Sequence, residues 1–357
     1  MSDVNDVSDV SVRDRIASLS PEQRALFERL RDQKKKPSAP RGHRPPPIPR
    51  RGPGDHWPLS FDQERLWFLY TLDPFATAYN IDTASRIRGR LDMAALSRAF
   101  QEIPQRHEIW RTSFRVIEGR PAQVISPAIV LPSPIVDLCA LPAELRELTA
   151  HELIVRETRR PFVLETGPLA RALLLRLDDQ DHICQLTVHH IVTDWVTFQL
   201  FWYELGVLYE AYAAGRPSPL PELPVQYADF TIWQRSWLQG EVLDTYRDYW
   251  LKRLAGAPLV LDLPTDRPRP AVQTSRGNRE AVRVERAAEL KGLARREGLT
   301  PFMAVLAVYQ ILLARHAGQE TLIVGAPNAN RNRQEIEPAF GFFLTQLAFC
   351  TDLGGDP

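Results

Sequence analysis

Apolar positions along the chain alternate between two patterns. From Trp57 onward, alternating apolar and polar residues predict strands, and apolar residues spaced by three and four predict helices. The predicted strands cover residues 78–91, 169–177, 182–188, 280–284 and 321–326, with a hairpin over 109–125. The predicted helices cover residues 93–106, 142–160, 196–214, 242–254 and 287–296. Mixed strands and helices in two runs predict an α/β (α+β) protein with two lobes, residues 57–225 and 226–357.

A charge-free run of 17 residues, 298–314, is the next feature of the pattern. It is shorter than the roughly 20 apolar residues that span a bilayer. Thr300 is a plausible N-cap and Pro301 a plausible first helical residue, while Gly318 is typical of a helix end. The run therefore predicts a buried helix of a soluble protein that has no membrane partner.

The first 56 residues differ from the rest. Apolar residues at helical spacing predict a short helical leader over residues 1–33. Residues 34–56 are rich in proline, lysine and arginine, which predicts an extended linker that buries little apolar surface. The leader is either an untethered segment or a docking segment for another polypeptide, and the sequence favours neither.

Composition narrows the function classes. A length of 357 residues, at roughly 150 residues per domain, suggests two domains. The 44 basic and 44 acidic side chains balance and the isoelectric point is near 7.1, which argues against nucleic acid as a partner. The acidic start has no apolar segment typical of a secretion signal. Three distant cysteines indicate a reducing cytoplasm and no disulfide framework.

The candidate chemistry lies in residues 187–194, where two adjacent histidines follow an apolar strand. Neighbouring residues of a strand face opposite sides, so His189 and His190 cannot serve the same surface. One is expected to pack, and the other to project from the strand end, where an imidazole can orient or accept a proton near neutral pH. Asp194 either orients that imidazole or pairs with a distant arginine.

Two other interpretations of the histidines remain open at this point. They are as readily explained as core residues with satisfied hydrogen bonds as they are by catalysis. A metal site would need a third ligand, and the sequence offers no obvious one nearby, so we predict no metal.

Several segments in the right order resemble the condensation domains of nonribosomal peptide synthetases. The residues from His189 to Asp194 resemble the central His-His-x-x-x-Asp motif of that family. The other segments that resemble family motifs are residues 59–69, 106–114, 161–169, 227–233, 324–331 and 341–343. The similarity is strongest to the subclass that joins L-configured donors to L-configured acceptors.

The resemblance implies a fold and an activity. The family folds as two lobes similar to chloramphenicol acetyltransferase, arranged as a V-shaped pseudo-dimer with a channel between them. Upstream donor and downstream acceptor carrier proteins present substrates on phosphopantetheine arms, and the acceptor amine attacks the donor thioester to form an amide. The domain itself binds no cofactor, and an adenylation domain usually adjoins it.

Residue roles follow from the same resemblance. His190 would orient or deprotonate the amine, and His189 would support the motif. Asp194 would be structural, with Arg331 as its ion-pair partner. For four further motif residues, packing and ion pairing are expected rather than catalysis: Arg65, Trp67, Arg111 and Tyr227.

The sequence departs from the family pattern in two places. Trp195 stands where the family has glycine, and Thr345 lies in a stretch that usually reads Val-Asn-Thr. Both are expected to modify the channel. They suggest an unusual acceptor, an ester-forming acyltransferase, or an inactive platform that recruits carriers or a tailoring enzyme. The later family motifs are absent, from which we expect a second lobe that is incomplete.

Overall fold

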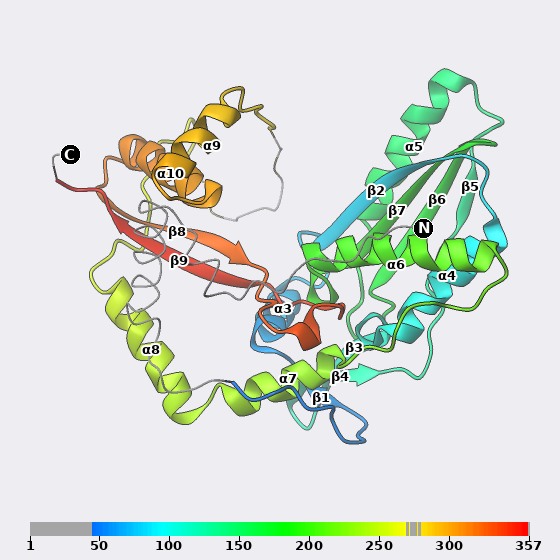
Figure 1. Ribbon diagram of the computed structural model, residues 1–357, viewed down its shortest axis with the longest axis horizontal. Coiled ribbons are helices and arrows are strands. Elements are labelled where there is room, and N and C mark those ends of the chain that lie inside the picture. The colour runs from blue at the N-terminus through cyan, green and yellow to red at the C-terminus, as the bar shows by residue number, and fades with distance from the viewer. Residues whose placement is uncertain (1–44, 269–270, 272–276, 278–279, 356–357) are drawn as a thin grey trace, which may run out of the picture. The chain divides into compact units, whose positions relative to one another are not determined.

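The computed structural model describes residues 45–268, 271, 277 and 280–355 (Figure 1). The chain divides after Pro47, and the compact part that begins there, Ile48–Pro357, is here called the second unit. The predicted leader, residues 1–33, and the linker up to residue 44 lie outside the described residues. The second unit contains β1 (Trp57–Pro58), α3 (Phe61–Leu72), β2 (Asn80–Arg88), α4 (Met93–Arg106), η1 (Glu108–Arg111), β3 (Thr112–Ile117), β4 (Arg120–Ile125), β5 (Ile135–Asp137), α5 (Ala143–Thr158), β6 (Ala170–Asp178), β7 (Asp181–His189), η2 (His190–Val192), α6 (Trp195–Ala213), α7 (Tyr227–Trp237), α8 (Gly240–Leu254), α9 (Ala287–Arg296), α10 (Pro301–Ala317), β8 (Thr321–Asn328), η3 (Gln334–Ile336) and β9 (Thr345–Asp352).

A four-stranded sheet in the order β2-β7-β6-β5 carries the histidine motif. The strands β2, β7 and β6 are antiparallel neighbours, and β5 pairs with β6 in parallel. Side chains of β7 alternate between the two faces, and both faces are covered. Cys184, Leu186 and Val188 join the larger core cluster, which also contains buried residues of α4 and α6. Ile183 packs instead with the smaller cluster, which contains Ala150 of α5.

A second, three-stranded sheet in the order β1-β4-β3 lies in the same half of the chain. Its hairpin turns at Glu118 and Gly119, which have φ values of 50° and 77°. Positive φ at both turn positions suits the right-handed twist of a two-residue hairpin. The predicted hairpin is therefore present over β3 and β4, while residues 108–111 form the short helix η1 instead of a strand.

Residues 226–357 contain helices α7 to α10 and the antiparallel pair β8-β9. Two expectations for these residues are wrong. Residues 280–284 are not a strand, because no described strand pairs with them to satisfy their backbone groups. Helix α10 is not buried: only Ala304 and Gln310 are buried on it, because α9 and β8, which pack against it, leave most of its apolar residues uncovered.

The segment between β8 and β9, residues 329–344, is here called the β8–β9 connection. It contributes five residues to the larger core cluster (Ile336, Ala339, Phe340, Phe342 and Phe343). These residues pack in one cluster with side chains of α3, α6 and α7. Strands β1 to β7 fall within residues 57–225 and β8 and β9 within 226–357; the division of the lobes at residue 225 stays a prediction.

Among the described residues, no single helix is long and apolar enough to cross a membrane. Helices α9 and α10 reach that length only together, and they are bent by 108° at the break between them.

The end of the predicted linker is anchored in the second unit. Ile48 is buried in the larger core cluster. The Arg51 guanidinium pairs with Asp229 of α7 at 2.9 Å and with Glu108 of η1 at 2.6 Å. It also lies over the Trp57 ring, 4.4 Å from the centroid. A paired arginine and a buried isoleucine thus fix residues 48–51, within the predicted linker over residues 34–56, to the second unit.

We expect Arg51→Ala to lower the free energy of unfolding by about 3 kcal/mol, because it leaves the buried Asp229 carboxylate without its cation. Arg86→Ala is the matched control, since Arg86 pairs with Asp181 and Glu147 at the surface. It should cost at most about 1 kcal/mol. Urea unfolding measures both values, and equal losses for the two variants would contradict an anchoring role for Arg51.

Candidate functional site

The site begins where β7 ends, at His189. This side chain is buried, and its Nδ1 accepts a hydrogen bond from the Ile191 amide at 3.2 Å. An accepting Nδ1 leaves the ring proton on Nε2. The rings of Tyr79 and Phe162 lie 6.5 and 6.2 Å from it, centroid to centroid. Burial, with a smaller contribution from His190, lowers the pKa of His189 to about 3, so the imidazole is neutral at pH 7.

His190 is the first residue of η2 and is half-buried. Its backbone amide donates to the Tyr79 carbonyl at 2.8 Å, which fixes the chain where it leaves the strand. Its Nδ1 lies 2.8 Å from the Thr193 carbonyl oxygen. Since a carbonyl can only accept, Nδ1 must carry the proton, and the lone pair of Nε2 is left for another partner. In their neutral forms the two histidines therefore carry the ring proton on opposite nitrogens.

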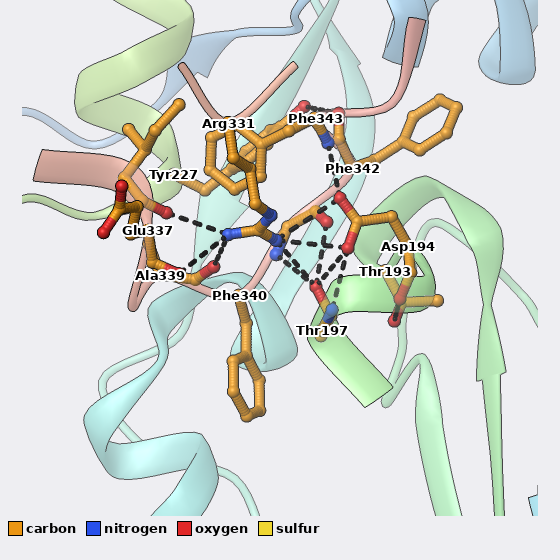
Figure 2. A network of polar contacts seen from close by, with 12 residues as sticks. Thr193, Asp194, Thr197, Tyr227, Arg331, Glu337, Ala339, Phe340, Phe342 and Phe343 are labelled. Atoms are coloured by element: carbon orange, nitrogen blue, oxygen red, sulfur yellow. Dashed lines mark hydrogen bonds and ion pairs between the residues drawn. The ribbon is translucent and has the colours of Figure 1, made fainter. Parts of the chain in front are cut away.

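Asp194 is the N-cap of α6, and its carboxylate is buried (Figure 2). Oδ1 accepts from the Thr197 amide at 2.8 Å and from the Thr197 hydroxyl at 3.0 Å. Oδ2 accepts from the Phe343 amide at 3.2 Å. Of the two roles left open for Asp194, the contacts fit pairing with a distant arginine, because both oxygens point to the helix start and the β8–β9 connection.

Arg331 supplies the cation that pairs with Asp194. Its Nη2 lies 3.1 Å from Oδ1 and 3.3 Å from Oδ2 of Asp194, and it also donates to the Thr197 hydroxyl at 3.2 Å. Its Nη1 donates to backbone carbonyls of the connection (Ile336, Glu337 and Ala339). The guanidinium also lies over the Phe343 ring at 4.3 Å. Burial lowers the pKa of Arg331, and Asp194 opposes that shift.

Tyr227 links α3, α7 and the β8–β9 connection. Its hydroxyl donates to the Phe342 carbonyl at 2.7 Å and lies 3.0 Å from the hydroxyl of Ser60, the N-cap of α3. Burial raises the pKa of the Tyr227 phenol, which stays protonated as a donor. Gly341 packs directly on its ring: a Cβ at Gly341 would lie 2.0 Å from a Tyr227 ring carbon.

The remaining predicted site residues are spread over the domain. Trp195 is the first residue of α6 and is 65% exposed, and Thr345 is half-buried at the start of β9. Arg65 is largely exposed, 3.8 Å from the Asp62 carboxylate. Arg111 pairs with Glu108 at 3.3 Å. Trp67 belongs to the larger core cluster. The structure thus brings His190, Asp194, Arg331 and Tyr227 around one segment. Arg65 and Arg111 lie elsewhere, and each is paired with a carboxylate of its own helix.

Sequence reasoning missed a second polar link to the connection. The His107 ring stacks on Phe340, with centroids 3.5 Å apart. Its Nδ1 accepts from the Phe340 amide at 3.3 Å, and its Nε2 donates to Glu204 of α6 at 2.7 Å. Burial lowers the pKa of His107, and Glu204 opposes this shift. His107 lies within residues 106–114, a segment that resembles a family motif, and this could have marked it as a candidate. Nothing in the sequence around Glu204 marked it as the partner of His107.

Among the residues described here, no group of three or more His, Cys, Asp or Glu side chains could hold a metal ion. The chemistry that these residues offer at the site is that of an imidazole held at Nδ1 by a backbone carbonyl, close in the sequence to the aspartate of a buried ion pair.

We expect Gly341→Ala to destabilise the protein by about 2 kcal/mol or more, because the added methyl overlaps the Tyr227 ring and neither partner can withdraw. Gly206→Ala is the control: Gly206 lies within α6, and no atom lies within 4 Å of the position that its methyl would take. This variant should be more stable by about 0.5–1 kcal/mol. Chemical denaturation of the two variants should give shifts of opposite sign; shifts of the same sign would contradict the packing described.

We expect His189 to make the protein less stable as the pH falls from 6.5 towards 4.5. The unfolded histidine takes up a proton near pH 6.5, while the native one stays neutral until about pH 3. The contribution of neutral His189 to the free energy of unfolding is therefore fully present above pH 6.5. It is lost as the pH falls below 6.5, and the loss is about 2–3 kcal/mol at pH 4.5. Unfolding curves at both pH values should show a smaller loss for His189→Gln, and equal losses would refute the buried neutral histidine.

Comparisons with known proteins identify relatives of the chain. Residues 54–356 match the family described as Condensation domain. The chain is 47% identical over 313 residues to one of the linear gramicidin synthase proteins of Brevibacillus parabrevis, covering 87% of this chain and 4% of the synthase. It is 44% identical over 338 residues to phosphinothricin tripeptide synthetase PhsC of Streptomyces viridochromogenes, covering 94% of this chain and 31% of PhsC. The chain thus spans less than a third of these curated relatives.

Solved structures show the same fold. The X-domain from teicoplanin biosynthesis superposes with a TM-score of 0.78 at 28% identity, covering 87% of this chain and 69% of that one. The first condensation domain of the calcium-dependent antibiotic synthetase, with a substrate analogue, superposes with a TM-score of 0.68 at 25% identity, covering 84% and 71%. The expected α/β fold, similar to chloramphenicol acetyltransferase, is confirmed, and the chain belongs to the condensation-domain family.

Proposed function

We propose that this chain joins a carrier-bound acyl or peptidyl thioester to the amine of a carrier-bound aminoacyl acceptor, and that His190 is the residue that receives the amine proton. The hydrogen bond from Nδ1 of His190 to the Thr193 carbonyl carries this proposal. It fixes the tautomer in which Nε2 is an acceptor, and the half-buried ring can be approached from outside the core.

The proposed reaction needs little more than a proton acceptor beside the amine. The acceptor nitrogen attacks the thioester carbonyl carbon, and the carbon–nitrogen bond forms as the carbon–sulfur bond breaks. The proton passes from nitrogen to Nε2 of His190 and then to the sulfur of the donor arm. A thioester is already activated, so holding the amine beside it supplies much of the rate.

The other site residues have supporting roles in this proposal. Asp194 and Arg331 hold the start of α6, and so the turn from which His190 projects, against the β8–β9 connection. His189 fixes η2 from the core side through the Ile191 amide. We assign Trp195 and Thr345 to substrate selection, where the exposed indole narrows the space available to an acceptor. Arg65 and Arg111 act through ion pairs within the fold.

The partners proposed are an upstream donor carrier, a downstream acceptor carrier and an adjoining adenylation domain. Their substrates are attached to phosphopantetheine arms, so the arm belongs to the substrate and the domain holds no cofactor of its own. We place the reaction in the cytoplasm.

A second candidate function is a recruiting platform with no condensation activity. Trp195, 65% exposed at the start of α6, favours it, because such an indole beside the motif suits a protein contact. The X-domain from teicoplanin biosynthesis has been solved in complex with OxyB, and it superposes on this chain with a TM-score of 0.74.

We expect His190→Ala to slow transfer between two loaded carriers by about 10²–10⁴-fold, because it removes the proton acceptor. Intact-protein mass spectrometry of the acceptor carrier measures the product, with amine and hydroxyl acceptors in parallel. His151→Ala is the control, an exposed histidine on α5, and should leave the rate unchanged.

The same experiment separates the alternatives. Product from hydroxyl acceptors alone would identify an ester-forming acyltransferase. Binding of both carriers without product from the unmodified protein would favour the recruiting platform. Product that survives His190→Ala would overturn the role of His190.

A further inference from the structure

His190 is held from a second side by a residue distant in the sequence. The Phe342 ring lies against its imidazole, with centroids 4.8 Å apart and planes inclined by 60°. Phe342 is 2% exposed and belongs to the β8–β9 connection, while His190 follows β7. The Thr193 carbonyl fixes the ring only at Nδ1, and one hydrogen bond leaves the imidazole free to tilt. An aromatic ring packed on it limits that tilt.

The backbone around Phe342 is unusually well fixed. Its carbonyl accepts from the Tyr227 hydroxyl at 2.7 Å. On one side, the Gly341 amide and carbonyl both contact the Thr197 hydroxyl, at 3.2 and 3.1 Å. On the other side, the Phe343 amide donates to Asp194 at 3.2 Å. Three consecutive residues of the connection are thus tied to α7 and to the start of α6.

The lack of a side chain at Gly341 allows the connection to lie directly on the Tyr227 ring. Any Cβ there would meet the Tyr227 ring at 2.0 Å. Glycine lets the connection approach so closely that the Tyr227 hydroxyl reaches the next carbonyl along, that of Phe342. The Tyr227 hydroxyl therefore restrains the backbone that carries the Phe342 ring against His190.

We propose that Phe342 is a positioning residue for His190, and that Tyr227 acts through it by fixing the Phe342 carbonyl. This inference rests on the proposed function, in which Nε2 of His190 receives the amine proton. Phe342 touches no reacting atom in this proposal; it keeps Nε2 aimed at the position of the amine. The ion pair of Asp194 with Arg331 acts one step further away, by holding the connection in place.

The first test is kinetic and uses transfer between loaded carriers. Phe342→Leu should lower kcat by about 10–100-fold, since a small misplacement of a proton acceptor costs that much, and leave KM for the acceptor carrier within about twofold. Phe100→Leu is the matched control, a phenylalanine of α4 buried to a similar extent that packs on Phe201. It should lose comparable stability but keep its kcat.

The second test observes the contact itself. With ¹³C-labelled histidine, the Cε1–H resonance of His190, assigned from its loss in His190→Ala, should show a ring-current shift from Phe342. Phe342→Leu should abolish that shift and Phe100→Leu should leave it. Tyr227→Phe, which removes only the hydroxyl, should reduce the shift and lower kcat less than Phe342→Leu does. This variant keeps the test valid even if Phe342→Leu folds poorly.

The outcomes for the two proposals differ. Loss of turnover in His190→Ala with normal kcat in Phe342→Leu would overturn the positioning role and leave the proposed function standing. Full turnover in His190→Ala would overturn the proposed function instead. If both hold, Phe342→Leu should have no further effect in the His190→Ala background, because the residue it positions is already gone.

Discussion

The buried ion pair between Asp194 and Arg331 is the constraint on which the rest of the site depends. Its two members are 137 residues apart, and both are removed from water. Burying two charges is costly unless the charged groups are also hydrogen-bonded, and here both oxygens and both terminal nitrogens have partners. The main effect of the pair is therefore to fix one arrangement of the start of α6 and the β8–β9 connection, rather than to add net stability through charge attraction.

That arrangement explains why motifs scattered along the sequence act together. Ser60, His107, Thr197 and Tyr227 come from different parts of the fold, and each contacts the connection or a residue that does. None of them is a reacting group in the proposed mechanism. Their shared effect is to shape one short stretch, residues 340–343, that faces the histidine turn. Glycine at 341 is needed there because backbone and ring are in direct contact.

The sequence predicts most strands and helices between residues 78 and 214, because alternation along β7 and the helical spacing of α4 are strong local signals, but it predicts neither α3 nor β5. It also places His190 at a strand end and pairs Asp194 with Arg331 through motif resemblance. It could not give the tautomers, which depend on Thr193 and Ile191 backbone groups, or the stacking of Phe340 on His107. The predicted strand over residues 280–284 and the predicted burial of α10 were wrong, because an apolar pattern alone cannot say which strands or helices pack against a segment.

The ion pairs of Arg51 connect the start of the second unit to the elements around the site. The Arg51 guanidinium forms ion pairs with Glu108 of η1 and with Asp229 in the first turn of α7. Residues 48–51 therefore connect two elements that are far apart in the sequence. Ile48 in the core and the Arg51 ion pairs together fix residues 48–51 beside the first turn of α7, which contains both Asp229 and Tyr227. A change at Arg51 is therefore expected to reach the hydrogen bond from Tyr227 to the Phe342 carbonyl through that single helical turn.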